Sequence, residues 1–278
     1  KLSDIKISAN WMGAPDKLKG DQDLYEAVEA VGMDLCPKWN ICIPVGKDSL
    51  SMATSWQDEK ENEHSVTSPI SLIVSAFASL KEVNLAITPQ INLTSSKSSE
   101  LIFIDLAKGK TRMGGSIAFQ VSSQFLGSVP DVECVNEMPE LVKVIHQLIK
   151  EKKIIAYHDR SDGGLICSLL EMAFCSRTGL DIKLDEACET TKQTLDFLFN
   201  EELGIVIQVP TENTQEVINI VSEVGLKDHI YRIASPNESK NIKVFQYESL
   251  AFEWKLSDLL KEWNFVSHKM QTLRDNPK

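Results

Sequence analysis

The sequence predicts a mixed fold, α/β and α+β, in which strands and helices alternate along 278 residues. Short apolar runs such as residues 101–106 and 205–209 have the length and composition of strands. Stretches such as residues 141–151 and 165–174 place apolar side chains three and four positions apart, the spacing of one helical face. This alternation is typical of a sheet covered by helices and excludes a helical bundle.

Residues 1–40 predict one strand and one helix. Ile5, Ile7 and Ala9 alternate with polar residues, as in a strand with one solvated face. Asp21 can cap a helix that closes at Pro37. The apolar face of that helix consists of Leu24, Ala27, Val28, Val31 and Leu35.

Residues 41–78 predict strands around two polar segments. The apolar run 41–45 predicts a short buried strand that leads directly into a polar loop, Gly46-Lys47-Asp48-Ser49. The charged stretch 57–64 predicts a hairpin loop. Residues 71–78 are almost continuously apolar, which predicts a strand buried on both faces.

The serine-rich stretch 94–100 is the clearest change of composition and predicts a linker between two domains. We therefore expect domains at residues 1–92 and 93–252, followed by a helical tail at 253–278. In the second domain we expect strands at 101–106, 154–157 and 205–209, and helices at 141–151, 165–174 and 214–224. The chain begins in mid-strand and ends in the polar LRDNPK, so we expect it to be part of a longer polypeptide.

Charge and composition exclude several classes of partner. The chain carries 29 Lys and Arg against 40 Asp and Glu, a net charge of −11, and its lysines are scattered. We therefore expect no nucleic-acid partner. No stretch reaches the roughly 18 to 20 apolar residues that cross a bilayer, and the N-terminus lacks the apolar core of a signal peptide. We expect no membrane partner and a cytoplasmic location.

The cysteines predict reduced thiols. They form no Cys-x-x-Cys pair, and several lie in apolar segments. The cysteines are Cys36, Cys42, Cys134, Cys167, Cys175 and Cys188. We expect small buried side chains, because a zinc site needs closely spaced Cys and His ligands.

The stretch IIAYHDRSDGGLICSLLEMAF, residues 154–174, places a polar cluster between an apolar strand and an apolar helix. Gly163 and Gly164 can let the backbone approach a ligand, and the free N–H groups at the start of the helix favour a phosphate. Asp159 follows the strand and is the kind of oxygen ligand that Mg²⁺ takes together with nucleotide phosphates. Ser161 can hydrogen-bond a phosphate.

A structural interpretation of the same cluster stays open. Ser161 or Asp162 can cap the helix, and Arg160 can pair with a neighbouring acid. The motif fits neither a P-loop nor a dinucleotide-binding fingerprint.

The segment PVGKDSLSM is a second candidate phosphate site. Lys47 can neutralise a phosphate, Asp48 can hold a metal or orient the lysine, and Ser49 can donate to a phosphate oxygen. An ordinary turn with a local pair of Lys47 and Asp48 is the alternative. Asn10, at a strand end, either faces the same site or caps a turn.

Glu201 and Glu202 are adjacent, but adjacent side chains point in different directions. We expect one solvated residue and one carboxylate at a helix end, and we assign no catalytic acid or base.

Several longer motifs occur in a fixed order from one end of the chain to the other: KISANWMGAP, IPVGKDSLSM, TSPISLIVSAFA, AYHDRSDGGL, LFNEELGIVIQV and MQTLRDNP. Together they closely resemble the phosphoribosylformylglycinamidine synthases of the large, single-chain form. The resemblance implies that this chain is the later part of the synthetase core of such an enzyme. Residues 1–92 are then the C-terminal part of an ATP-binding α/β domain of the aminoimidazole-ribonucleotide-synthetase type, and 93–252 its α+β partner domain.

The resemblance also implies a function. These enzymes are C–N bond-forming ligases of purine biosynthesis that convert formylglycinamide ribonucleotide, glutamine and ATP to the amidine, ADP, phosphate and glutamate. The implied cofactors are ATP or ADP and Mg²⁺, and the implied partners are upstream synthetase domains and a downstream glutaminase domain of the same polypeptide. We expect the chain by itself to lack the full reaction.

Individual residues follow from the resemblance. Asp159 corresponds to a Mg²⁺ ligand and Ser161 to a nucleotide contact, with further ligands expected upstream of this chain. Gly46 to Ser49 lie where smaller, separate-subunit relatives carry a Gly-Asn-x-Ser loop for ATP, metal and substrate phosphate. Because Lys47 replaces that Asn, we expect a phosphate contact there and no metal.

Two other functions stay open at this point. The chain can be a structural module whose bound ADP supports the fold without turnover. Alternatively, it can be another enzyme of the same fold, such as a selenophosphate synthetase or a thiamine-phosphate kinase, although these lack IPVGKDSLSM.

Overall fold

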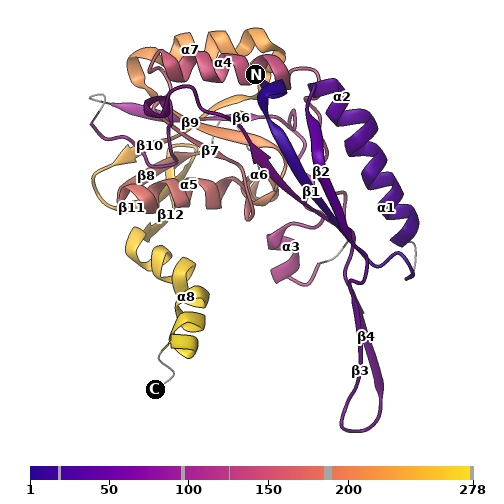
Figure 1. The fold of residues 1–278 in the computed structure, drawn as a ribbon. Coiled ribbons are helices and arrows are strands. Elements are labelled where there is room, and N and C mark those ends of the chain that lie inside the picture. Colours follow the sequence, from indigo (N-terminus) through magenta and orange to yellow (C-terminus); the bar gives the residue numbers. More distant parts are fainter. Residues whose placement is uncertain (18–19, 95–97, 125, 185–189, 276–278) are drawn as a thin grey trace. The chain divides into compact units, whose positions relative to one another are not determined.

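A computed structural model describes residues 1–17, 20–94, 98–124, 126–184 and 190–275 (Figure 1). The chain divides into two compact units: Lys1–Val83 with Val135–Lys143, and Asn84–Cys134 with Val144–Lys278. The domain boundary predicted at residues 92 and 93 stays a prediction, and residues 95–97 of the predicted linker lie outside the described residues. In the described residues no helix has the length and apolarity needed to cross a membrane.

The first unit is built on a three-stranded sheet with the order β2-β1-β5, in which β1 pairs with β2 in parallel and with β5 antiparallel. A separate hairpin, β3 and β4, carries the polar turn predicted around residues 57–64. The elements of the first unit are η1 (Leu2–Asp4), β1 (Lys6–Met12), α1 (Gly20–Glu29), η2 (Ala30–Leu35), α2 (Cys36–Trp39), β2 (Cys42–Ser49), β3 (Ala53–Gln57), β4 (Glu63–Thr67) and β5 (Ser71–Phe77).

Three expectations for this unit were wrong. The helix does not close at Pro37: it continues to Trp39, because Pro37 stands in the first turn of α2 and Asn40 ends the helix in a left-handed conformation. The segment 46–49 is no loop, since it forms the end of strand β2. β5 is not buried on both faces: the adjacent residues Ile73 and Val74, which point to opposite faces, are 54% and 47% exposed.

The second unit is built on a seven-stranded sheet with the order β12-β11-β8-β10-β6-β9-β7. Its pairs are antiparallel, except that β11 and β8 run parallel. The remaining elements of the chain are η3 (Val83–Leu85), β6 (Ser99–Asp105), α3 (Ile117–Val121), α4 (Met138–Lys150), β7 (Ala156–Asp159), α5 (Gly164–Ser176), β8 (Gly179–Lys183), α6 (Thr191–Phe199), β9 (Gly204–Pro210), η4 (Thr211–Asn213), α7 (Thr214–Val221), η5 (Ser222–Leu226), η6 (Lys227–His229), β10 (Ile230–Asn237), β11 (Asn241–Gln246), β12 (Ser249–Lys255) and α8 (Leu256–Asp275).

The strands at 101–106 and 205–209 and the helices at 141–151, 165–174 and 214–224 are therefore confirmed within a few residues. The strand predicted at 154–157 lies two residues later, since β7 begins at Ala156 and ends at Asp159. The helical tail begins at Leu256, two residues after Trp254, which lies in β12.

Both faces of the large sheet are covered, and α5 and α7 lie on opposite sides of it (Figure 1). Phe103 of β6 and Val206 of β9 belong to the hydrophobic cluster that contains Leu165, Leu169 and Met172 of α5. The intervening residues of the same strands are also fully or nearly buried, including Ile102, Ile104 and Ile207. Central strands buried on both faces explain why these segments are apolar without alternation.

Among the described cysteines only Cys134 is buried, and Cys42 and Cys175 are exposed. Uniform burial of the thiols was therefore a wrong expectation. Cys188 lies outside the described residues.

Leu169 tests the central packing. Leu169→Ala is expected to lower the free energy of unfolding by about 2 to 5 kcal/mol, because the side chain is fully buried and leaves a cavity. Leu195→Ala is the matched control, since Leu195 is 52% exposed in α6, and a change within about 0.5 kcal/mol is expected. Urea unfolding measures both, and equal losses would contradict this assignment of the core.

Candidate nucleotide-binding loop

The predicted nucleotide loop joins β7 to α5 and exposes two of its predicted ligands. Asp159 ends β7 and Ser161 follows two residues later, and both are exposed. The Tyr157 hydroxyl donates to Asp159 Oδ1 at 2.7 Å. Burial, and next the charge of Asp159, raise the pKa of Tyr157, so that its hydroxyl keeps the proton that it donates. The Tyr157 hydroxyl therefore orients the Asp159 carboxylate, which is exposed to solvent.

A buried serine of α5 holds the backbone of this loop. Ser168 Oγ donates to the Asp159 carbonyl at 3.0 Å, and the Ser161 N–H donates to Ser168 Oγ at 3.2 Å. Ser168 is fully buried, so the two exposed residues are fixed through their backbones. The Ser161 hydroxyl itself donates to the Asp159 carbonyl at 3.2 Å.

Arg160, between these two residues, points into the protein. Its Nη2 donates to Asp105 Oδ1 at 3.0 Å and to the Leu203 carbonyl at 2.7 Å, and its Nε donates to the Glu202 carbonyl. Burial lowers the pKa of Arg160, while the charge of Asp105 opposes that shift. The acid that pairs with Arg160 is therefore Asp105, 55 residues earlier, and no neighbour in the loop.

The start of α5 is not capped by Ser161 or Asp162. Gly163 occupies the N-cap position with φ 84°, and no side chain caps it there. Gly164 has φ 81°, and a Cβ on it would lie 2.6 Å from the Leu198 carbonyl oxygen. The glycine is therefore required by the close approach of the chain at residues 198–200, whatever ligand the loop holds.

The two amides proposed for a phosphate already have internal acceptors. The Gly163 N–H donates to Glu201 Oε1 at 2.7 Å, and the Gly164 N–H donates to the Ser161 carbonyl at 2.9 Å. A carboxylate of the protein thus occupies the place that the sequence suggested for a ligand anion.

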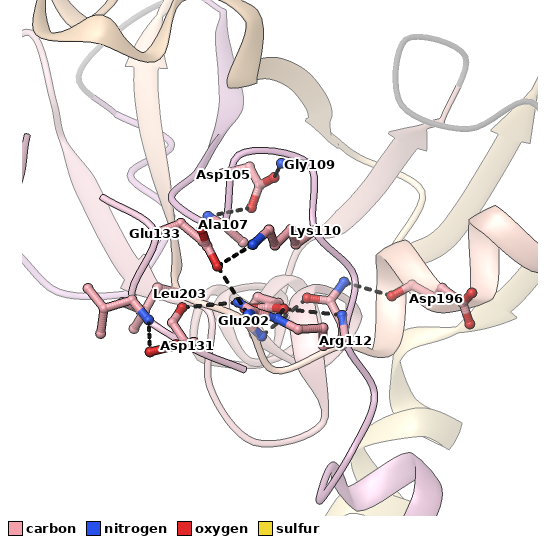
Figure 2. A network of polar contacts seen from close by, with 12 residues as sticks. Asp105, Ala107, Gly109, Lys110, Arg112, Asp131, Glu133, Asp196, Glu202 and Leu203 are labelled. Carbon is pink, nitrogen blue, oxygen red and sulfur yellow. Dashed lines mark hydrogen bonds and ion pairs between the residues drawn. The ribbon is translucent and has the colours of Figure 1, made fainter. Parts of the chain in front are cut away.

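The adjacent glutamates have roles that the sequence analysis missed. Glu202 is fully buried and forms a bidentate pair with Arg112, in which Nη2 and Oε2 are 2.8 Å apart. Figure 2 shows Arg112 between Glu202 and Glu133, with Lys110 donating to Glu133 at 2.7 Å. Hydrogen bonding to Glu202 raises the pKa of Arg112 further. The expectation of a solvated residue was wrong, because neither glutamate is exposed. Glu201 is a carboxylate at a helix end, since its Oε1 accepts from the N-cap of α5.

The second group of predicted residues lies in the first unit, on strands β1 and β2. Lys47 Nζ donates to Ser49 Oγ at 2.7 Å, and Ser49 Oγ donates to Asn10 Oδ1 at 3.5 Å. In the parallel register Asn10 stands opposite Lys47 and Trp11 opposite Asp48. Alternation along a strand therefore places Lys47 and Ser49 on one face, and Gly46 and Asp48 on the other. The structure brings Asn10, Lys47 and Ser49 together.

Two pockets of the second unit contain none of the predicted site residues. A pocket of about 540 Å³ is lined by residues 86–88 and 90–94 with Ile155 and Ser176, and contains none of them. A smaller pocket of about 210 Å³ is lined by Asp105, Lys110 and Arg160, among others. The residues in the loop that suit a ligand are those exposed at its surface, Asp159 and Ser161.

The loop offers one side chain that suits Mg²⁺. Asp159 offers an exposed, oriented carboxylate, which suits an ion that also takes water and phosphate oxygens. Among the residues that the structure describes, no three Asp, Glu, His or Cys side chains converge to hold a metal. Asp159 can therefore supply one protein ligand of a shared site.

The pair of Glu202 and Arg112 supports the fold beneath the loop. Glu202→Gln is expected to lower the free energy of unfolding by about 3 kcal/mol or more, because it leaves a guanidinium without its buried counter-charge. Glu140→Gln is the control, since that carboxylate pairs with Lys143 at the surface and should contribute little. Urea unfolding compares the two variants, and a Glu202→Gln protein as stable as the parent would contradict a structural role.

Comparisons with known proteins agree with this architecture. Residues 1–79 match the family model described as FGAR-AT PurM_N-like domain, and residues 106–246 match that of AIR synthase related protein, C-terminal domain. The chain is 41% identical, over 279 aligned residues, to a phosphoribosylformylglycinamidine synthase of Schizosaccharomyces pombe. The alignment covers 99% of this chain and 21% of that relative, so the chain spans about a fifth of its length.

Solved structures share the fold at low identity. The structure described as T. maritima PurL complexed with ATP has a TM-score of 0.55 at 13% identity, covering 91% of this chain and 37% of that one. E. coli HypE has a TM-score of 0.60 at 15% identity, covering 88% of this chain and 71% of that one. The AIR synthase-related C-terminal model alone spans half of the sequence. The chain therefore belongs to the AIR synthase-related family.

Proposed function

We propose that the chain is the later part of the synthetase core of a single-chain phosphoribosylformylglycinamidine synthase. The observation that carries this proposal is the 41% identity along 99% of the chain. The whole enzyme would consume formylglycinamide ribonucleotide, glutamine and ATP and would form the amidine. The remaining synthetase domains and a glutaminase domain would belong to the same polypeptide, because the matched relative is about five times as long.

Within this enzyme, the loop that carries Asp159 and Ser161 would bind a nucleotide and its metal. The Asp159 carboxylate would be one ligand of Mg²⁺, which supplies positive charge to offset that of the phosphates. The Ser161 hydroxyl would turn from the Asp159 carbonyl to a phosphate oxygen. Gly163 and Gly164 would shape this loop through the turn that they form, since their amides already have acceptors.

The residues of β1 and β2 would contact a phosphate of the substrate or nucleotide. Lys47 supplies a positive charge, and Ser49 and Asn10 supply hydrogen-bonding groups on the same face. Gly46 and Asp48 alternate to the other face of β2, so Asp48 would act separately from this trio.

A second candidate function is a structural nucleotide site. It is favoured by the hydrogen bonds within the protein that hold the loop, because Ser168 and Glu201 fix its backbone without a ligand. A site of this kind would hold MgADP without turnover. Its loss would change the stability of the polypeptide and leave its chemistry intact.

Asp159→Asn in the full-length polypeptide tests the proposal. The variant keeps the acceptor for Tyr157 but loses the charge that Mg²⁺ requires, so ATP-dependent amidine formation should fall about 100-fold or more with the fold retained. Asp162→Asn is the matched control, since Asp162 is an exposed acid of the same loop, and its activity should stay near the parent's. Full turnover in Asp159→Asn, with weaker MgADP retention, would establish the structural alternative.

A further inference from the structure

Glu201 connects the candidate nucleotide loop to a second segment of the same unit. One carboxylate oxygen, Oε1, accepts from the Gly163 N–H at 2.7 Å and from the Ile117 N–H at 2.8 Å. Gly163 is the N-cap of α5 and Ile117 is the first residue of α3. A single side chain therefore fixes the spacing between the start of α3 and the nucleotide loop, although 46 residues separate them in sequence.

The backbone that carries Glu201 is immobilised on both sides. Asn200 is fully buried, and its side-chain amide donates to the Asp196 and Phe197 carbonyls at 2.6 and 3.0 Å. The Asn200 side-chain oxygen accepts from the Glu202 N–H at 3.2 Å, and Glu202 is held by Arg112. The Glu201 carboxylate thus projects from a rigid base and does not rely on its own packing for its position.

The position of this carboxylate bears directly on Ser161. The Gly164 N–H donates to the Ser161 carbonyl, which closes the turn 161–164, and Glu201 accepts the Gly163 N–H inside that turn. Without Glu201 the Gly163 N–H loses its acceptor, and a glycine with φ 84° is free to change conformation. Ser168 would still hold the Ser161 N–H, but the turn that follows Ser161 would lose one of its fixed points.

We propose that Glu201 is a positioning residue of the nucleotide site: it holds the turn 161–164 in the conformation that presents Ser161 beside Asp159. This inference rests on the proposed function, because it concerns the same loop. The competing idea is that Glu201 is an internal anion that a phosphate must displace from Gly163. The two ideas predict opposite effects of removing the carboxylate.

The test is MgADP binding to the full-length polypeptide by calorimetry, with hydrogen exchange at the Gly163 and Ile117 amides. Glu201→Ala should weaken binding about tenfold and should speed exchange at both amides, with the polypeptide still folded. Glu201→Gln should restore affinity to within about threefold of the parent, since its amide oxygen can accept both bonds. Glu223→Ala, an exposed glutamate on η5, is the matched control and should match the parent.

The outcomes separate this inference from the proposed function. Binding by Glu201→Ala that equals or exceeds the parent's, while Asp159→Asn is impaired, would overturn the positioning role alone. A parent polypeptide that does not bind MgADP would overturn both. Where Glu201→Ala does not fold, Glu201→Asp takes its place, because its shorter side chain withdraws the carboxylate from the amides, and the same loss is expected.

Discussion

The candidate site depends on the contacts that the buried guanidinium of Arg160 makes. Arg160 lies between the exposed Asp159 and Ser161, yet its side chain reaches Asp105 and the carbonyls of Glu202 and Leu203. Its guanidinium lies over the Phe103 ring at 4.9 Å. A charge taken this far from water needs all of these partners, so the ends of β6, β7 and β9 must meet in one arrangement. That arrangement turns the neighbouring side chains outward.

The short segment before β9 completes this arrangement. The side chains of this segment point in three directions. Asn200 bonds to the end of α6, Glu201 to the nucleotide loop, and Glu202 to Arg112. Gly204 follows them, and a Cβ there would lie 2.6 Å from the Phe103 ring. The segment therefore serves as a rigid support beneath the loop. Rigid support allows two exposed residues, Asp159 and Ser161, to keep a defined spacing without being buried.

The sequence predicted the second unit better than the first, for a physical reason. Strand 205–209 is buried on both faces and most of helix 165–174 is buried, so their composition alone shows their environment. β2 and β5 border a small sheet, where exposure depends on which neighbours are present, and local composition does not report that. The pairing of Glu202 with Arg112, and of Glu201 with Gly163, joins distant segments and leaves no periodic signal. Asp159 and Ser161 could be singled out because polar residues between two apolar elements are visible locally.

The proposed function requires that the turn between β7 and α5 hold a metal-bound nucleotide. Its most direct test is hydrogen–deuterium exchange of the full-length polypeptide with and without MgADP, read from peptides that cover residues 154–174. Slower exchange is expected across residues 159–164 when MgADP is bound, because ligand contacts to Asp159 and Ser161 restrain that turn. Slower exchange confined to other segments, with no change at residues 159–164, would contradict it.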